Sequence, residues 1–114
     1  MQYLARSAAC ESVTPQTYLE HVFRVLVRGR CYLRKVLRYA LGWDAEAIRR
    51  ILDLAAEYHD LGKLNDENQR VLAGEREATR LPVPHADAGI AYLTERDAWL
   101  SAFLVYAHHA GLPD

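Results

Sequence analysis

Apolar residues recur every three to four positions along most of the chain, the spacing of one face of an α-helix. Early in the chain this pattern predicts a helix over residues 15–28, with helical spacing continuing to about residue 41 and Gly29 either ending or weakening the helix. Thr14 and Pro15 match a helix start, a capping hydroxyl followed by proline at the first helical position. Because no segment alternates between apolar and polar residues with flanking turn signals, we expect an all-α fold.

The rest of the chain continues the helical pattern after a break at Gly42-Trp43-Asp44. We expect Asp97 to cap the last helix and Gly89 to allow close contact between helices. In the second helix, His59 continues an apolar face and should point inward. The predicted helices cover residues 45–59, 66–72 and 86–95, and a last helix follows Asp97 and leads into His108.

Length and composition indicate one domain, residues 1–114. Apolar residues make up 51% and charged residues 25%, as in soluble globular proteins. No apolar run approaches the roughly 20 residues that span a bilayer, and the N-terminus lacks the pattern of a secretory signal. We expect Cys10 and Cys31 to be free thiols in a reducing cytoplasm, and no membrane association.

The net charge of −1 conceals an uneven distribution of basic residues. Residues 1–43 carry seven Lys and Arg against only Glu11 and Glu20. Such a stretch is more often a solvated helix face than a ligand site. If the substrate is a phosphodiester, these basic residues are instead expected to bind its phosphate backbone. The basic excess consists of Arg24, Arg28, Arg30, Arg34, Lys35 and Arg38.

All five histidines lie at positions suited to a metal site. Imidazole and carboxylate are ligands that divalent metals accept, and a carboxylate beside a histidine can bridge two ions. Two ions about 3.5–4 Å apart can hold a phosphoryl group and activate water. We therefore predict a binuclear site for Mn, Ni, Co, Fe, Mg or Zn. The candidate ligands are His21, His59, Asp60, His85, His108 and His109.

Structural explanations exist for most of these residues. A single histidine on an apolar face, such as His21, is usually part of the core or surface. His59 and Asp60 would suit a helix C-terminus and a turn, and His85 would suit a loop. The adjacent pair His108-His109 is hardest to explain in this way, because partly buried imidazoles need polar partners.

The same residues resemble the HD superfamily of metal-dependent phosphohydrolases, and within it the HD nuclease domain of the type I CRISPR-associated helicase-nuclease. The resemblance covers nearly the whole chain and depends on an ordered set of segments rather than on the His-Asp doublet alone. Asn68 stands where the family has Phe. The matching segments are Tyr3-Leu4-Ala5-Arg6-Ser7, the helix with His21, Tyr58-His59-Asp60-Leu61-Gly62-Lys63, Asn68-Gln69-Arg70-Val71-Leu72, His85-Ala86-Asp87-Ala88-Gly89 and His108-His109-Ala110-Gly111-Leu112-Pro113-Asp114.

The resemblance implies two sets of metal ligands that share Asp60. The first ion would be held by His21, His59 and Asp60, and the second by Asp60, His85, His108 and His109. Lys63 would lie near the substrate phosphate. The family cuts single-stranded DNA beside a helicase domain or subunit that feeds the strand, and a CRISPR surveillance complex recruits it.

One departure from the family changes these expectations. The family's site includes a further aspartate on a later helix, whereas Asp114 corresponds to its Gly-Leu-Pro-Asp segment. We therefore expect an HD-domain helical bundle that lacks its C-terminal helices, with the first ion bound weakly and activity reduced.

Two other functions remain open from the sequence. One is an HD-family phosphohydrolase of nucleotides or cyclic dinucleotides, although the cyclic-dinucleotide branch expects Gly-Tyr-Pro where this chain has Ala110-Gly111-Leu112-Pro113. The other is an inactive metal-binding or interaction module. Gln69 and Asp87 are interpreted as structural residues or as supports of the ligands rather than as catalytic residues, and Tyr58 and Trp43 as core residues.

Overall fold

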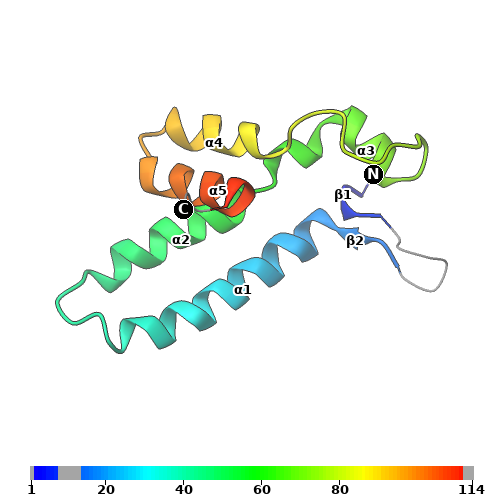
Figure 1. The fold of residues 1–114 in the computed structure, drawn as a ribbon. Coiled ribbons are helices and arrows are strands. Elements are labelled where there is room, and N and C mark those ends of the chain that lie inside the picture. The colour runs from blue at the N-terminus through cyan, green and yellow to red at the C-terminus, as the bar shows by residue number, and fades with distance from the viewer. Residues whose placement is uncertain (1, 8–13, 112–114) are drawn as a thin grey trace.

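The computed structural model describes residues 2–7 and 14–111, and this part of the chain is mostly helical (Figure 1). The expectation of a mainly helical protein is confirmed. The elements in chain order are β1 (Leu4–Arg6), β2 (Gln16–Thr17), α1 (Tyr18–Leu37), α2 (Ala45–Tyr58), the 3₁₀ helix η1 (Leu61–Leu64), α3 (Asp66–Leu72), α4 (Ala86–Thr94) and α5 (Trp99–Ala110).

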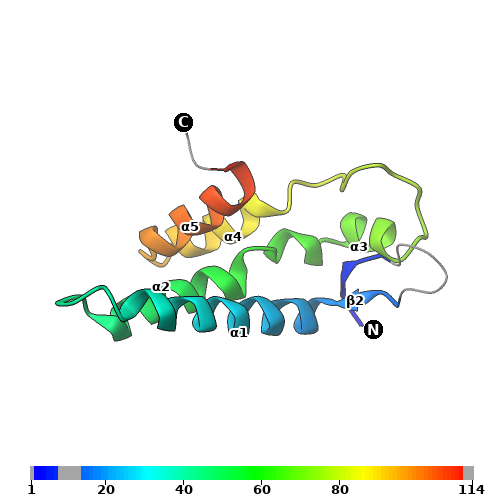
Figure 2. The same ribbon diagram turned by 60° about the horizontal axis from the view of Figure 1, so that its bottom comes forward.

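The long helix α1 runs antiparallel to α2, and this pair forms one side of the molecule (Figures 1 and 2). The pair accounts for much of its elongated shape, which measures 51 × 32 × 32 Å. Gly29 does not end α1. A Cβ at Gly29 would lie 3.4 Å from the Leu52 side chain, so the missing side chain lets the two helices approach closely.

The start of α1 differs from the prediction. The N-cap is Thr17, whose hydroxyl accepts a hydrogen bond from the Glu20 amide, while the Glu20 carboxylate accepts one from the Thr17 amide. This reciprocal capping box satisfies two amides that a helix end would otherwise leave unpaired. The predicted cap at Thr14, with Pro15 in the first turn, is therefore wrong.

The hydrophobic core lies between α2, α4 and α5. Ala55, Leu93, Ala102 and Val105 are buried together, and partly buried residues such as Tyr58 pack against them. The expected core position of Tyr58 is thus correct, whereas Trp43 is 66% exposed and does not belong to the core. The Ser101 hydroxyl donates to the Ile51 carbonyl at 2.8 Å, which fixes α5 against α2.

The predicted cap at Asp97 is also wrong. Asp97 has φ 57°, a left-handed conformation that Asp tolerates better than most residues, and it lies in the turn between α4 and α5. The Ala98 amide donates to the Leu93 carbonyl, which closes the end of α4. Ala98 is the N-cap of α5, and it provides no side-chain capping bond.

The expectation that the chain has no strands is contradicted by a small antiparallel sheet. Strand β1 pairs with β2 in the register Leu4 with Thr17 and Arg6 with Gln16. The outer edge of β1 is covered by the Gln69 side chain, whose oxygen accepts from the Leu4 amide and whose NH₂ donates to the Leu4 carbonyl. The Gln69 side chain thus makes the two backbone hydrogen bonds that a neighbouring strand would make, and its expected structural role is confirmed.

No helix in residues 2–7 and 14–111 is both long enough and apolar enough to cross a membrane. Cys31 is a free thiol on the surface, as expected, and Cys10 lies outside the described residues.

Candidate metal centre

Four histidines from four separate parts of the fold surround the Asp60 carboxylate. His21 comes from the first turns of α1, His59 from the end of α2, His85 from the residue before α4, and His109 from the end of α5. Asp60 follows His59 directly, where α2 gives way to η1. Residues far apart in the sequence thus meet at one point of the fold.

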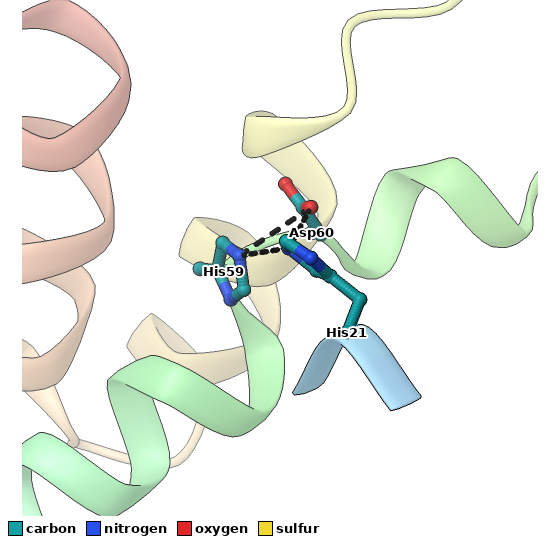
Figure 3. A group of neighbouring side chains, drawn as sticks. All are labelled: His21, His59 and Asp60. Carbon is teal, nitrogen blue, oxygen red and sulfur yellow. Dashed lines mark hydrogen bonds and ion pairs between the residues drawn. The ribbon is translucent and has the colours of Figure 1, made fainter. Parts of the chain in front are cut away.

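The best-formed group consists of His21, His59 and Asp60 (Figure 3). All three side chains are buried, and Asp60 is only 3% exposed. The Asp60 Oδ2 atom lies 3.1 Å from His21 Nε2 and 3.4 Å from His59 Nε2. The two Nε2 atoms are 3.1 Å apart, so three potential ligand atoms point at the same small volume.

The outer hydrogen bonds of these histidines show why a cation fits between them. His59 Nδ1 donates to the Ala56 carbonyl at 2.8 Å, and His21 Nδ1 donates to Gln16 Oε1 at 3.3 Å. In its neutral form, each ring then presents an unprotonated Nε2 to the centre. Two such lone pairs and a carboxylate repel one another unless a cation lies among them. The group can therefore hold a metal ion.

The charge state of Asp60 suits this role. Burial raises the pKa of a carboxyl group, but here hydrogen bonds from His59 and Lys63 and their positive charge outweigh it and hold the pKa of Asp60 well below its usual range. Lys63 Nζ lies 2.7 Å from Asp60 Oδ2. Asp60 is thus a carboxylate at neutral pH, as a metal ligand must be.

The two histidines of this group respond differently to burial. Burial lowers the pKa of His21, so its neutral, ligating form is favoured at neutral pH. Burial also lowers the pKa of His59, but the hydrogen bond to Asp60 and the charge of Asp60 raise it overall. The Asp60 carboxylate thus attracts positive charge to this side of the group, whether a proton or a metal ion provides it.

A second group on the other side of the carboxylate contains Asp60, His85 and His109. Asp60 Oδ1 lies 3.8 Å from His85 Nε2 and 3.5 Å from His109 Nε2. This group is more open, because the His85 and His109 side chains are 32% and 19% exposed. His109 Nε2 also lies 2.9 Å from the His59 carbonyl and donates to it, so binding a metal through this nitrogen would replace that hydrogen bond.

His108 lies next to the centre but in neither group. Its ring meets the His59 ring edge-on, with 5.4 Å between the ring centroids. Burial lowers the pKa of His108, and the neighbouring His109 and His59 lower it further. The structure therefore brings five of the six predicted ligands together and leaves His108 beside them.

Glycine and asparagine hold His85 in place. A Cβ at Gly62 would lie 2.6 Å from both the Cα and the carbonyl oxygen of His85, so only glycine permits this approach, and the Gly62 amide donates to the same carbonyl at 3.0 Å. The fully buried Asn68 amide donates to the carbonyls of Gly62 and Val83 and accepts from the Val83 amide. Together these contacts attach the segment before α4 to η1.

Gly89 brings α4 against the end of α2. A Cβ at this position would lie 2.0 Å from the Tyr58 carbonyl oxygen, which confirms the predicted close helix contact. The contact occurs one residue before His59. It therefore fixes the distance between the helix that follows His85 and the helix that ends at His59.

Sequence analysis missed two residues that position the centre, Gln16 and Asn68. The Thr17-x-x-Glu20 pattern is itself a capping-box signature, and it would have placed the helix start at Tyr18 and Gln16 just before it. Asn68 was noticed only as a departure from the resemblance. A fully buried amide with three partners has no local sequence signal, because its partners lie in separate segments.

Comparison with known protein families, curated proteins and solved structures gives no match to this chain. The interpretation of the centre therefore depends on its own geometry and on the motifs described above.

Proposed function

We propose that this protein is a metal-dependent nuclease that hydrolyses phosphodiester bonds of single-stranded DNA in CRISPR interference. The main support is the position of Asp60, whose two carboxylate oxygens face the two separate histidine groups. This is the arrangement a carboxylate needs to bridge two ions. His21 and His59 complete the first set, and His85 and His109 the second, with His108 at its edge.

The residues of the chain have distinct roles in this proposal. Asp60 and the histidines bind and orient the ions, and the hydrogen bonds that His21 and His59 donate to Gln16 and to the Ala56 carbonyl keep both rings in the ligating tautomer. When bound, divalent ions supply an activated water and neutralise charge on the phosphoryl oxygens. Lys63, 14% exposed and held on Asp60, lies within reach of a phosphate at the same position.

The partners follow from the family resemblance and from the chemistry of the reaction. A strand must be single to enter a site recessed among helix ends, so a helicase domain or subunit is expected to deliver it. A CRISPR surveillance complex would select the target. The chain itself needs only to hold the ions and the scissile phosphate.

Metal-dependent cleavage of labelled single-stranded DNA tests the proposal. We expect cleavage with Mn²⁺ or Ni²⁺, and a loss of at least about a hundredfold in Asp60→Asn and His59→Ala, because each removes a ligand. Asp66→Asn is the matched control, since it removes an exposed carboxylate on α3 that lies outside both groups.

Two outcomes would contradict the proposal in different ways. Hydrolysis of mononucleotides or cyclic dinucleotides without cleavage of DNA would identify the other kind of HD phosphohydrolase. Metal binding that is lost in Asp60→Asn, without turnover of any phosphate ester, would identify a metal-binding module.

A further inference from the structure

We propose that one face of α1, formed by Arg24, Arg28 and Tyr32, binds the nucleic-acid strand on its way to the Asp60 centre. This strand track rests on the proposed function and adds the surface that would make the protein act on a polymer rather than on a mononucleotide.

The strand track is one wall of a groove that opens onto the metal centre. The groove has a volume of about 400 Å³. His21 and His108, at the edge of the centre, line one part of it, and none of its described lining residues carries a carboxylate. The lining residues are Arg6, Gln16, His21, Arg24, Val25, Arg28, Gly29, Tyr32 and His108. A groove with this composition attracts anions.

Among the described residues, the arginines of the strand track lack the ion pairs that several other arginines form. In the part of the chain that the structure describes, neither Arg24 nor Arg28 forms an ion pair or a side-chain hydrogen bond, and both are exposed. Four other arginines are paired with carboxylates, two of them with the same one: Arg30 with Asp53, Arg49 with Glu46, and Arg70 and Arg76 with Glu67. Unpaired guanidinium groups beside a catalytic centre remain available for phosphate oxygens.

The spacing along α1 matches an extended strand rather than a single nucleotide. Arg24, Arg28 and Tyr32 follow at intervals of four residues, so they share one helix face and are each about 6 Å apart along the axis. That interval is comparable with the separation of successive phosphates in an extended single strand. His21 and Tyr32 are separated by about 16 Å of helix, which a mononucleotide does not cover.

Tyr32 provides the aromatic surface that single-strand binding sites use. Its side chain is 62% exposed, and Lys35 Nζ lies 5.6 Å from the ring centroid. An exposed ring flanked by cationic groups allows a base to stack while the phosphates are neutralised, and this mode of binding tolerates any base. A merely solvated helix face does not account for an aromatic ring in line with two unpaired arginines.

Binding of a fluorescein-labelled dT12 oligonucleotide, measured by anisotropy in EDTA, tests the strand track without catalysis. We expect the Arg24→Gln/Arg28→Gln variant to bind at least about tenfold more weakly than the parent. Its salt dependence, as the slope of log K against log salt, should fall by about 1.4, since each lost phosphate contact removes about 0.7 for a single strand. Tyr32→Ala should weaken binding with little change in that slope.

The Arg34→Gln/Arg38→Gln variant is the matched control, because it removes the same charge from exposed positions at the end of α1, outside the groove. Circular dichroism should show the same helix content in both double variants. Equal loss of dT12 binding in the two variants would overturn the strand track, as would unchanged binding in Arg24→Gln/Arg28→Gln or the absence of dT12 binding by the parent.

Hydrolysis of the small diester bis(p-nitrophenyl) phosphate separates this proposal from the proposed function. We expect the parent to hydrolyse this probe with Mn²⁺, because the reaction needs the Asp60 centre and no bound strand. Hydrolysis of the small diester by the parent, together with dT12 binding that does not depend on Arg24 and Arg28, would overturn the strand track and leave the proposed function in place. Arginine-dependent dT12 binding without any hydrolysis would remove the nuclease and leave the strand track in place.

Discussion

At the scale of single residues, Tyr18 is the clearest case of an unsatisfied group. Its ring is buried at the start of α1, and its hydroxyl has no hydrogen-bond partner among the described residues. Burial, with the nearby charges of Asp60 and Glu57, raises the pKa of Tyr18 to about 12. The neutral hydroxyl therefore lost its water on folding and gained no bond in return.

We expect Tyr18→Phe to keep or increase stability, by up to about 1 kcal/mol, because it removes only the unpaired hydroxyl. Urea denaturation followed by circular dichroism measures the free energy of unfolding. Leu72→Ala, at another buried position, is a control that should destabilise the protein. A loss of more than about 1 kcal/mol in Tyr18→Phe would show that the hydroxyl is hydrogen-bonded in solution.

Gly62 gives a second prediction at this scale, concerning metal binding. In Gly62→Ala the new methyl group would lie 2.6 Å from the backbone of His85, so the His85 segment must move away from Gly62 and lose its position beside Asp60. We expect calorimetric titration with Mn²⁺ to show weaker binding at the group that contains His85 and unchanged binding at His21, His59 and Asp60.

Gly29→Ala is the matched control for that titration. Its methyl group would meet only the flexible end of the Leu52 side chain, at 3.4 Å. Equal metal binding in Gly62→Ala and the parent would mean that His85 does not contribute a ligand.

At the scale of elements, the bounds of the helices in the middle of the chain could be predicted closely from the sequence, and the start of α1 could not. The predicted helix at 66–72 is α3 (Asp66–Leu72), and the prediction for 45–59 differs from α2 (Ala45–Tyr58) by one residue. Two competing start signals lie close together before α1, and the hydrogen-bonded one at Thr17 prevails over Thr14. Strands β1 and β2 are too short for an alternating pattern to be visible in the sequence. Gln69, which stabilises β1, lies far from it in the sequence.

The contact between α1 and α2 has an electrostatic component that depends on pH. Arg30 binds Asp53 through two hydrogen bonds, from Nε at 2.9 Å and from Nη2 at 2.7 Å. The hydrogen bonds from Arg30, with its positive charge, hold the pKa of Asp53 below its ordinary value. A lowered pKa in the folded state means that the pair stabilises the protein above the unfolded-state pKa of about 4 and loses this effect as the pH falls below it.

We therefore expect Asp53→Asn to be less stable than the parent at pH 6, with the difference shrinking as the pH is lowered from 5 to 3. Urea denaturation of both proteins across this range measures the difference. Asp44→Asn is a control on the same helix, because asparagine also caps well. A difference that stays constant with pH would show that Asp53 stabilises the contact by packing and not by charge.

At the scale of the whole molecule, the sequence identified most of the centre but not its arrangement. The ordered histidines and Asp60 were found because ligand residues are chemically distinctive. The position of His108 outside both groups depends on how α5 rotates against α2, since adjacent residues on a helix point about 100° apart. That rotation is set by packing around Ser101 and Val105, which no local pattern encodes.

Because the core lies between α2, α4 and α5, side chains on the inner and outer faces of α4 and α5 should differ in how much they stabilise the protein. Leu93 on α4 is 1% exposed and packs between α2 and α5, whereas Phe103 on the outer side of α5 is 56% exposed. Leu93→Ala should therefore cost about 2–5 kcal/mol of unfolding free energy, through lost burial and the cavity that remains. Phe103→Ala should change it by no more than about 0.5 kcal/mol, as surface substitutions usually do.

Denaturation curves of the two variants, recorded at the same protein concentration, decide whether the core is confined to α2, α4 and α5. The two substitutions are matched, since each truncates one large apolar side chain on a neighbouring helix to alanine. Similar losses in both would mean that the outer face of α5 is covered in solution, because a side chain that is already exposed has little burial to lose. The larger loss in Leu93→Ala alone would place the stabilising contacts between α2, α4 and α5, the helices that position His59, His85 and His109.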